Sequence, residues 1–434
     1  MKKTNLVTFI SLVLICLCST ALSAATIVVD PNEDNSPNYT TIQEAIDNSN
    51  DGDTIEVMPS TYYENINFKG MEIKVTSTNP DDMAIVYTTV INGGLSGDTV
   101  TFATSEDSAS ILTGITVENG SRGIYCDNSS PTIEKCVIRN SKSGDGIPGL
   151  NASPAIKNCI IRKNKGDGIY GCGGHITDCS VEENTGDGIS NCDGIILRTN
   201  VIANGLNGLY KCNGIIDESS ITGSGSHGLR ECDGTVKNSA IQGNNDSGIF
   251  YADGTEVYNC VISGNSSYGI GYIYGLVTNC TIVGNESQGI VTTSSTSSSR
   301  ILTISNNIIV NNDMYGINQV RSATQVNLLN NNIWGNTSGH YTGYLTTGET
   351  DIHVDPLFAA NGSWAMAEFG LKAITTCNRK PADWKMATGS MTTQKQAHVL
   401  TQATRQATPS PKRLQPAESS TRVHTAERKQ QVDQ

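Results

Sequence analysis

Apolar residues recur along most of the chain in short groups, and a Gly-Ile or Gly-Leu pair follows each group at a regular distance. From Gly168 to Gly289 these glycines stand 20 or 21 residues apart, with looser steps at both ends. An asparagine stands four residues before most of them, and one or two apolar residues stand just before that asparagine. The repeat glycines are Gly123, Gly146, Gly168, Gly188, Gly208, Gly228, Gly248, Gly269, Gly289 and Gly316. This period predicts stacked units of about twenty residues.

One such unit cannot bury its own apolar face, but a stack of units closes a continuous core and pairs each strand with the strands above and below it. Twenty residues at roughly 3.3 Å each suit a coil of three short strands and three bends. Left-handed solenoids use a six-residue period, which this sequence lacks. We therefore predict an all-β fold, a right-handed parallel β-helix over residues 51–358.

The recurring asparagines are expected to stack as a ladder of side-chain amides inside one turn, at the strand spacing of about 4.8 Å. Ser224 takes the place of the asparagine once. The expected members are Asn119, Asn164, Asn184, Asn204, Asn244, Asn265, Asn285 and Asn312. This ladder gives the asparagines a structural role.

The first 24 residues have the pattern of an export signal. Lys2 and Lys3 precede an apolar stretch over residues 6–17, and small residues follow at 21–25. The apolar stretch is too short to span a bilayer. We therefore expect a signal peptide over residues 1–24, no membrane span, and a mature protein that is secreted or held at the cell surface.

The cysteines follow the same period and form two columns. In an exported protein, disulfides are one interpretation of such cysteines. However, residues one coil apart in a parallel ladder fit relaxed disulfide geometry poorly, and buried cysteine packs well as a small hydrophobe. We favour two inward stacks of free thiols. The columns are Cys172, Cys192, Cys212 and Cys232, with Cys126 close by, and Cys136, Cys159, Cys179, Cys260 and Cys280.

Charge is divided unevenly between the repeat and the C-terminal segment. Residues 1–364 carry a net charge of −19, and residues 365–434 carry +6. The acidic body disfavours nucleic acid, which needs basic side chains to neutralise its phosphates. It also disfavours polyanionic sugars unless metal ions bridge the two. Residues 359–434 lack the repeat and are predicted to form a basic, disordered tail.

The tail also fits a shifted reading frame from about residue 365. If one G is restored after the codon of Trp364, permitted codons for the residues that follow can give a continuation that contains SPCIDAGDP and, near its end, GAYGG. Together with Asp355-Pro-Leu-Phe358, these strings resemble the usual ending of a group of bacterial exported β-helix proteins. In that case residues 365–434, with Cys377, His398 and His424, carry no evolved function.

The repeat resembles the pectate-lyase-like right-handed parallel β-helix (PbH1 repeat) superfamily. The stretches Tyr39–Asp47, Gly52–Val57 and Tyr62–Ile66 resemble the N-terminal end of these proteins, where a short amphipathic helix caps the open core. Ile42, Ala45 and Ile46 share one helical face, which suits a cap over residues 25–50 after a first strand. The resemblance covers residues 26–358. It implies the fold but no single activity, because the superfamily includes lyases, hydrolases, esterases, epimerases and proteins without known catalysis.

The residue before the repeat glycine is acidic in three successive coils, at Asp145, Asp167 and Asp187. Such an oxygen cluster could hold a Ca²⁺ ion, the one cofactor that the sequence suggests. The alternative is structural, because Asp-Gly is a common turn dipeptide. A second column that precedes glycine has the same two interpretations and comprises Asp193, Asn213, Asp233 and Asp253.

His227 and Arg230 share one coil, next to Lys211 and Glu231, and form the one basic cluster on the acidic repeat. Lyases of the superfamily need a basic residue to take the proton beside a uronate, often with Ca²⁺ neutralising the carboxylate. The resemblance therefore makes His227, Arg230 and Lys211 candidate catalytic residues. No catalytic motif of these lyases or hydrolases matches the sequence residue by residue, and a solvated turn is the alternative.

Aromatic residues favour binding more than catalysis. Tyr125, Tyr170, Tyr210 and Phe250 all stand two residues after the repeat glycine, with Arg230 in the same column. The residue between is apolar and expected to point inward, so period-two alternation places this column on the surface. Tyr251, Tyr268, Tyr272 and Tyr274 are expected to cluster nearby. Exposed rings beside acidic acceptors suit stacking on sugar faces, whereas an inward column would be core.

These observations lead to one function and two alternatives. The first is an exported β-helix that binds or acts on extracellular polysaccharide or a cell-surface glycan, as a monomer. The second is a non-catalytic adhesion or spacer protein of the cell surface. The third is a calcium-dependent polysaccharide lyase.

Overall fold

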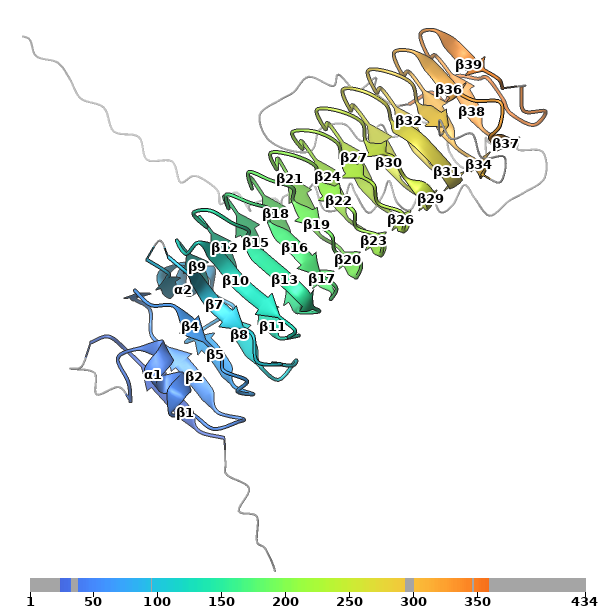
Figure 1. Cartoon of the computed structure of the whole chain (residues 1–434). Helices are drawn as coiled ribbons and strands as arrows, with labels where there is room; N and C mark the ends of the chain where they lie inside the picture. Colours follow the sequence, from blue (N-terminus) through green and yellow to red (C-terminus); the bar gives the residue numbers. More distant parts are fainter. Residues whose placement is uncertain (1–23, 33–37, 95, 293–299, 346, 359–434) are drawn as a thin grey trace, which may run out of the picture.

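The chain forms an elongated solenoid of stacked parallel strands, with a short helix at its N-terminal end (Figure 1). The computed structural model describes residues 24–32, 38–94, 96–292, 300–345 and 347–358. The predicted signal peptide (except residue 24) and the predicted tail, with its suspected frame shift, lie outside these residues. No helix in the described part is long and apolar enough to cross a membrane.

The strands form three parallel ladders, which we call sheets A, B and C. Sheet B is a 13-stranded sheet, and sheets A and C form one 26-stranded sheet because they share the nine-residue β31. Sheet A comprises β1 (Thr26–Val29), β2 (Thr54–Val57), β5 (Lys74–Ser77), β8 (Ile111–Thr113), β11 (Thr132–Glu134), β14 (Ala155–Lys157), β17 (Ile176–Thr177), β20 (Ile195–Leu197), β23 (Ile215–Asp217), β26 (Thr235–Lys237), β29 (Asp253–Tyr258), β31 (Ile270–Thr278), β34 (Ile301–Ser305) and β37 (Gln325–Leu329).

Sheet B comprises β3 (Thr61–Tyr62), β6 (Val90–Asn92), β9 (Thr116–Glu118), β12 (Val137–Arg139), β15 (Ile160–Arg162), β18 (Ser180–Glu182), β21 (Asn200–Ile202), β24 (Ser220–Thr222), β27 (Ala240–Gln242), β30 (Val261–Ser263), β32 (Thr281–Val283), β35 (Ile308–Val310) and β38 (Asn332–Trp334). Sheet C comprises β4 (Ile66–Asn67), β7 (Asp98–Phe102), β10 (Arg122–Asp127), β13 (Ile147–Ala152), β16 (Ile169–Cys172), β19 (Ile189–Ser190), β22 (Leu209–Tyr210), β25 (Leu229–Arg230), β28 (Ile249–Phe250), β31, β33 (Ile290–Thr292), β36 (Tyr315–Gln319) and β39 (Gly339–Gly343).

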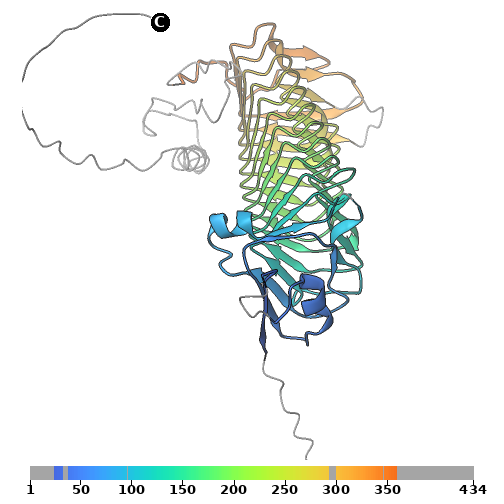
Figure 2. The ribbon, with the colours of Figure 1, turned by 90° about the vertical axis from the view of Figure 1, so that its left-hand side faces the viewer.

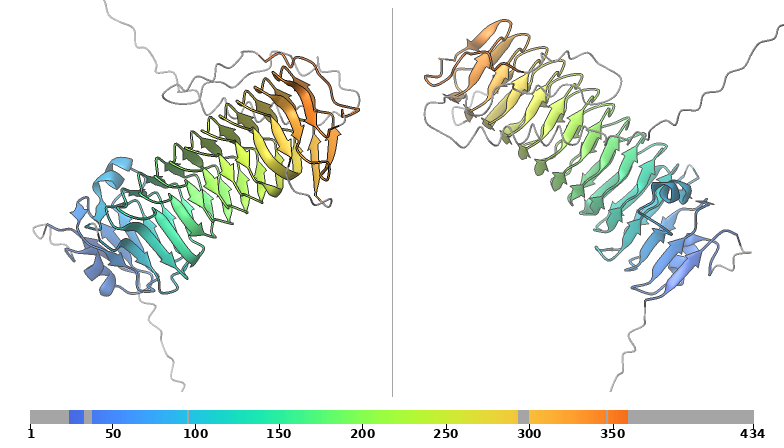
Figure 3. Two further views of the ribbon diagram at one scale, coloured as in Figure 1. Left: turned by 45° about the horizontal axis from the view of Figure 1, so that its top comes forward. Right: turned by 180° about the vertical axis from the view of Figure 1, so that it is seen from behind.

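Each coil runs through sheets C, A and B in turn, and the next coil repeats the path one strand spacing further along the axis (Figures 2 and 3). The register is set by the period of the sequence: Ile189 pairs with Leu209 in sheet C, and Val201 pairs with Ile221 in sheet B. Identical positions of successive repeats therefore lie directly above one another. Residues that form one column in the sequence are therefore neighbours in space.

Each of the three corners turns on one residue with a left-handed backbone, followed by a residue that points inward. In one coil the left-handed residues are Asn191, Arg198 and Ala203, with φ angles of 52°, 47° and 52°. Asparagine and glycine adopt this conformation at the least cost, which explains their abundance at the corners. The inward residues that follow are Cys192, Thr199 and Asn204, all buried.

The core is a column of aliphatic side chains with two thiol columns at its corners. All ten described cysteines are buried and free, as the sequence analysis favoured. Burial raises the pKa of the Cys212 thiol, because an apolar core disfavours the thiolate. These cysteines are therefore packing groups.

The asparagine ladder is present as predicted, with one break and one misplaced member. Successive side chains are joined by amide hydrogen bonds of 2.9–3.0 Å, for example Asn164 Nδ2 to Asn184 Oδ1 and Asn244 Nδ2 to Asn265 Oδ1. Ser224 interrupts the ladder, and its buried Oγ has no hydrogen-bond partner among the described residues. Asn336, absent from the prediction, ends the ladder.

The placement of Asn119 in this ladder was wrong. Asn119 is the left-handed corner residue, with a φ of 63°, and its amide bonds to Glu118 instead of a neighbouring coil. Gly120 takes the position in the ladder. Its carbonyl oxygen accepts the N–H of Lys142 in the next coil, just as the carbonyl oxygen of Asn164 accepts the N–H of Thr185. The corner loop before Gly123 is thus one residue shorter than the loop before Gly168. A second amide ladder, which the sequence analysis missed, joins Asn307, Asn331 and Asp351.

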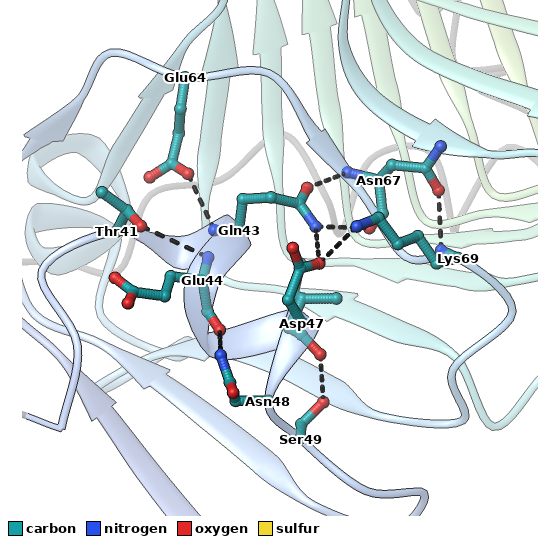
Figure 4. A network of polar contacts seen from close by, with 10 residues as sticks. Thr41, Gln43, Glu44, Asp47, Asn48, Ser49, Glu64, Asn67 and Lys69 are labelled. Carbon is teal, nitrogen blue, oxygen red and sulfur yellow. Dashed lines mark hydrogen bonds and ion pairs between the residues drawn. The ribbon is translucent and has the colours of Figure 1, made fainter.

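Helix α1 (Ile42–Asp47) covers the N-terminal end of the core with Ile42, Ala45 and Ile46 buried, the three residues whose spacing predicted a buried face. Figure 4 shows the polar contacts that hold it. Both carboxylate oxygens of Glu64 accept backbone N–H groups of the first turn, from Ile42 at 2.8 Å and Gln43 at 2.9 Å. The negative charge of Glu64 also interacts favourably with the positive end of the helix dipole. A second short helix, α2 (Met83–Thr88), lies beside β9.

Candidate functional site

One outward column of sheet C carries the aromatic residues that the sequence analysis singled out. Its members pair by register from coil to coil, and each follows a fully buried isoleucine or leucine. In order they are Tyr125, Pro148, Tyr170, Ser190, Tyr210, Arg230, Phe250 and Gly271. The strand pleat therefore turns this column away from the core, as period-two alternation predicts.

The rings in this column reach solvent. Tyr170 is 43% exposed, and Tyr125, Tyr210 and Phe250 are half-buried. The rings occupy every second coil, because Pro148, Ser190 and Arg230 stand between them and Gly271 follows Phe250. Pro148, Ser190 and Gly271 are buried, so the rings project above these three positions, whereas Arg230 is half-buried with its guanidinium 5.7 Å from the Tyr210 centroid. A role of these rings in binding remains a prediction.

Three of the four rings are held in place by a cationic or imidazole side chain. The Arg122 guanidinium lies 3.9 Å from the centroid of the Tyr125 ring and pairs with both oxygens of Asp98 at 2.6 and 2.7 Å. Lys211 Nζ lies 5.0 Å from the Tyr210 centroid. Such cation–π contacts restrict the motion of the ring.

His227 supports the third of these rings, Phe250. Its imidazole is stacked on Phe250 with 4.3 Å between the ring centroids. Phe250 also meets Tyr251 and Tyr272 edge-on, at 4.4 and 5.4 Å between centroids. Tyr268 contacts Tyr272 at 6.0 Å, which completes a five-ring cluster. Tyr274, which was expected in this cluster, instead lies under the guanidinium of Arg300, 4.4 Å away.

The column of Asp145, Asp167 and Asp187 lies beside the aromatic column and bonds to the backbone. Asp145 Oδ1 accepts the N–H of Asp167 at 2.7 Å, and Asp167 Oδ1 accepts the N–H of Asp187 at 2.8 Å. The series goes on through Asn207 and His227, and the second oxygen of Asp167 accepts the hydroxyl of Ser190. This contact joins the acidic column to the aromatic column.

Burial raises the pKa values of Asp145 and Asp187, because partial desolvation disfavours the carboxylate. Within the described residues, no group of three or more His, Cys, Asp or Glu side chains is arranged to hold a metal ion. The residues that would hold Ca²⁺ are these three aspartates, each of which gives one oxygen to a backbone N–H. The calcium site remains a prediction.

The three predicted catalytic residues lie together but are engaged in other contacts. Lys211 Nζ and Arg230 Nε lie 3.7 and 3.2 Å from Glu231 carboxylate oxygens. His227 is 6% exposed, and its Nδ1 accepts the N–H of Ser247 at 3.3 Å. Burial lowers the pKa of His227, because desolvation disfavours the protonated imidazole. Their catalytic role remains a prediction.

A hollow of about 430 Å³ lies next to the aromatic column. It is lined by Lys211, Asn213, Glu231, Asp233, Tyr251 and Asp253. The second acidic column of the sequence analysis forms one wall, where Asp233 Oδ1 accepts the N–H of Asp253 at 2.9 Å. The hollow is thus polar, with one aromatic edge.

The sequence profile of the family described as "Right handed beta helix region" matches residues 149–276 and 208–333. The chain folds as a right-handed parallel β-helix. The resemblance to the pectate-lyase-like superfamily is thereby confirmed for the fold. No curated protein matches the sequence.

Several solved structures are similar to this β-helix. The A-module of the mannuronan C-5 epimerase AlgE6 of Azotobacter vinelandii has 18% identity and a TM-score of 0.49, with 73% of this chain and 94% of that chain covered. The A-module of AlgE4 from the same organism has 16% identity and a TM-score of 0.46, with 72% and 95% covered. Pectate lyase Pel9A has 14% identity and a TM-score of 0.37, with 84% and 91% covered.

The sequence analysis found the rings of the β-helix but missed their alternation and their supports. The alternation was hidden because the steps from Gly123 to Gly146 and from Gly146 to Gly168 are 23 and 22 residues, whereas the steps from Gly168 to Gly248 are 20. Counting coils instead of residues would have shown it. The bond between Asp167 and Ser190 joins different coils and different columns, so no pattern along the chain could indicate it.

Proposed function

We propose that the β-helix binds an extracellular polysaccharide on the outward face of sheet C. The observation that carries the proposal is the column of Tyr125, Tyr170, Tyr210 and Phe250, partly exposed and in register along one ladder. A tyrosine ring offers a flat apolar surface with a polar edge, which suits the apolar face and the hydroxyl groups of a sugar. Several such rings in a line suit a polymer.

The supports of the rings favour binding further. A ring that is already fixed loses little conformational entropy when a ligand covers it. Arg122, Lys211 and His227 fix Tyr125, Tyr210 and Phe250 in this way. The neighbouring carboxylates add hydrogen-bond acceptors for sugar hydroxyl groups.

The charge of the face favours an uncharged glycan over a polyanion. Asp145, Asp167 and Asp187 line one side of the aromatic column, and Asp233 and Asp253 line the hollow on the other. Lys211 and Arg230 are both paired with Glu231. Asp253 is paired with Arg300, but Asp145, Asp167 and Asp187 form no ion pair within the described residues, so they would repel a polyanionic chain along one side of the column.

The place of action that fits this ligand is outside the cytoplasm. The export signal predicted over residues 1–24 would deliver the protein there, secreted or at the cell surface. We propose that it acts there as a monomer, with a glycan and not a nucleic acid as its partner.

Affinity electrophoresis in gels that contain one polysaccharide each tests the proposal. We expect retardation of the protein in at least one neutral polysaccharide. The double variant Tyr170→Ala/Tyr210→Ala should lose about tenfold or more in affinity, the loss expected for central aromatic contacts. Tyr63→Ala is the matched control, because Tyr63 is 79% exposed and lies between β3 and β4, outside the aromatic column. Equal retardation of all three proteins would contradict the proposal.

A second candidate is a calcium-dependent lyase, which one observation favours. Burial lowers the pKa of His227, which favours the neutral imidazole, and Arg230 lies near it. A neutral imidazole can accept a proton, as a lyase base must. Absorbance of an unsaturated product from uronate polymers, present with Ca²⁺ and lost with a chelator and in His227→Asn, would establish this activity. The absence of both binding and cleavage would favour the adhesion or spacer protein.

A further inference from the structure

The aromatic column of sheet C has a period of two coils. Each ring lies two steps of the ladder from the next, in the order Tyr125, Tyr170, Tyr210 and Phe250. Pro148, Ser190 and Arg230 stand at the steps between. Neighbouring strands lie about 4.8 Å apart, so successive rings repeat at roughly 10 Å along the axis. The six steps from Tyr125 to Phe250 span roughly 29 Å.

The residues between the rings make this period a feature of the surface. Ser190 is 1% exposed, and its hydroxyl is turned toward Asp167. At Gly271 a Cβ atom would lie 2.9 Å from Phe250 Cδ2 and 2.7 Å from Tyr268 Cδ2. A side chain at this step would therefore displace the rings. The buried Pro148 and Ser190 thus separate the first three rings, whereas Arg230, between Tyr210 and Phe250, is half-buried and its guanidinium lies 5.7 Å from the Tyr210 centroid.

We infer that the ligand is an uncharged, extended glycan with a two-sugar repeat, which lies along the solenoid axis with one disaccharide to every two coils. This inference rests on the proposed function and names the class of polysaccharide. In a ribbon-like chain of β-1,4-linked pyranoses, each sugar is turned by about half a turn relative to the one before it. Every second sugar therefore presents the same face, at a repeat close to the spacing of the rings.

The match in period decides which glycans can use all four rings at once. A chain with a twofold ribbon shape meets each ring with an equivalent sugar, so the contacts add along the polymer. A coiled glycan, or one with a three-sugar turn, falls out of register after the first ring. The carboxylates of Asp145, Asp167 and Asp187 beside the column exclude a polyanionic ribbon by repulsion.

Removal of one coil changes the period without removing a ring, and removal of two coils restores the period. A deletion of residues 181–200 joins Ser180 to Val201, which replaces Val181 in the register of sheet B. It keeps all four rings but places Tyr210 directly next to Tyr170. A deletion of residues 181–220 joins Ser180 to Ile221, loses Tyr210, and leaves Tyr170 and Phe250 two coils apart. Solenoids tolerate such changes because each repeat contacts only its neighbours.

Calorimetric titration with neutral β-1,4-linked oligosaccharides of increasing length gives the readout. We expect the affinity of the wild type to rise by about tenfold with each added disaccharide until the rings are covered. The one-coil deletion should lose the gain from the longer oligosaccharides, although it has four rings. The two-coil deletion, which has three rings, should still gain affinity stepwise as the oligosaccharide becomes longer. Thermal melting of all three proteins checks that they are folded.

Two results would overturn the inference while the proposed function stands. One is equal affinity of the one-coil deletion and the wild type for long oligosaccharides. The other is loss of polysaccharide binding in Tyr170→Ala/Tyr210→Ala together with a preference for acidic or coiled glycans. Absence of binding to any glycan would instead contradict the proposed function itself.

Discussion

The imidazole of His227 lies parallel to the ring of Phe250, with 4.3 Å between the ring centroids and 9° between the ring planes. The two residues belong to successive coils and to different columns, His227 to the acidic column and Phe250 to the aromatic column. The stacked rings of His227 and Phe250 therefore bring the acidic column and the aromatic column into contact. Nδ1 of His227 is turned to the backbone N–H of Ser247, so the ring is fixed on both sides.

Replacement of His227 should destabilise the β-helix. His227→Ala leaves the buried N–H of Ser247 without an acceptor and opens a gap beside Phe250, at a cost of about 2–3 kcal/mol. His227→Asn is the matched control, because Asn207 already accepts the N–H of His227 at the equivalent position one coil earlier. Urea unfolding measures both. An equal loss in the two variants would show that the acceptor is unimportant.

His227 should also make stability depend on pH. Burial lowers its pKa in the folded protein below the unfolded value of about 6.5, although Asp246 opposes this effect. The unfolded chain then binds more protons, so the contribution to stability is fully present above that value and is lost as the pH falls through the folded pKa. We expect the free energy of unfolding to fall between pH 7 and pH 5 in the wild type and to fall less in His227→Asn.

Asp187→Asn should stabilise the protein at neutral pH by about 1 kcal/mol. Burial raises the pKa of Asp187, so its contribution is favourable when protonated and is lost as the pH rises through the folded pKa. The amide removes the buried charge and keeps an oxygen for the N–H of Asn207, which Asp187 accepts at 2.7 Å. The gain should vanish near pH 4.

The exposed Asp193→Asn serves as the control for this change, with no comparable gain. The same pair of variants also tests calcium. If Ca²⁺ binds to the column, added Ca²⁺ will raise the melting temperature of the wild type more than that of Asp187→Asn. A loss of stability in Asp187→Asn without Ca²⁺ would contradict the electrostatic argument.

Ser224→Asn should repair the asparagine ladder. Ser224 N donates to Asn244 Oδ1, but the Ser224 Oγ is buried without a partner in the described part of the chain. An asparagine here can accept from Asn204 and donate to Asn244, as the other members do, for a gain of about 1–2 kcal/mol. Asn204→Ser, which widens the gap to two successive coils, should instead destabilise. A fall in melting temperature for Ser224→Asn would show that the site cannot accept the amide.

The thiol columns should react only after unfolding. All ten described cysteines are buried, and burial raises the pKa of Cys212, so few thiolates reach a reagent in the folded state. We expect a thiol reagent to label these ten slowly in buffer and rapidly in denaturant. Reducing agent should leave the melting temperature unchanged. A lower melting temperature with reductant would reveal disulfides.

The architecture could be predicted from the sequence because a strict period converts directly into register. Ile189 and Leu209 are twenty residues apart in the sequence and neighbours in space. Asn119 shows where this reasoning fails: a corner loop that is one residue shorter moves the asparagine out of the ladder, although its distance from Gly123 is the usual one. Loop length at a corner depends on backbone angles that the period does not record.

The candidate site could be predicted only in part. The outward direction of Tyr170 follows from its place after a buried isoleucine. The use of Asp145 and Asp167 as backbone acceptors could not be predicted, because Asp-Gly also fits a solvated turn or a cation site. The choice depends on the distance to the next coil's N–H, which only the three-dimensional structure supplies.

Covalent footprinting of the protein with and without a bound neutral polysaccharide tests the central claim most directly, because it locates the ligand. We predict that Tyr125, Tyr170, Tyr210 and Phe250 become protected together, while the exposed Tyr63 and Tyr344 are labelled as before. Protection of residues elsewhere on the solenoid, with these four rings labelled as in the free protein, would contradict the account.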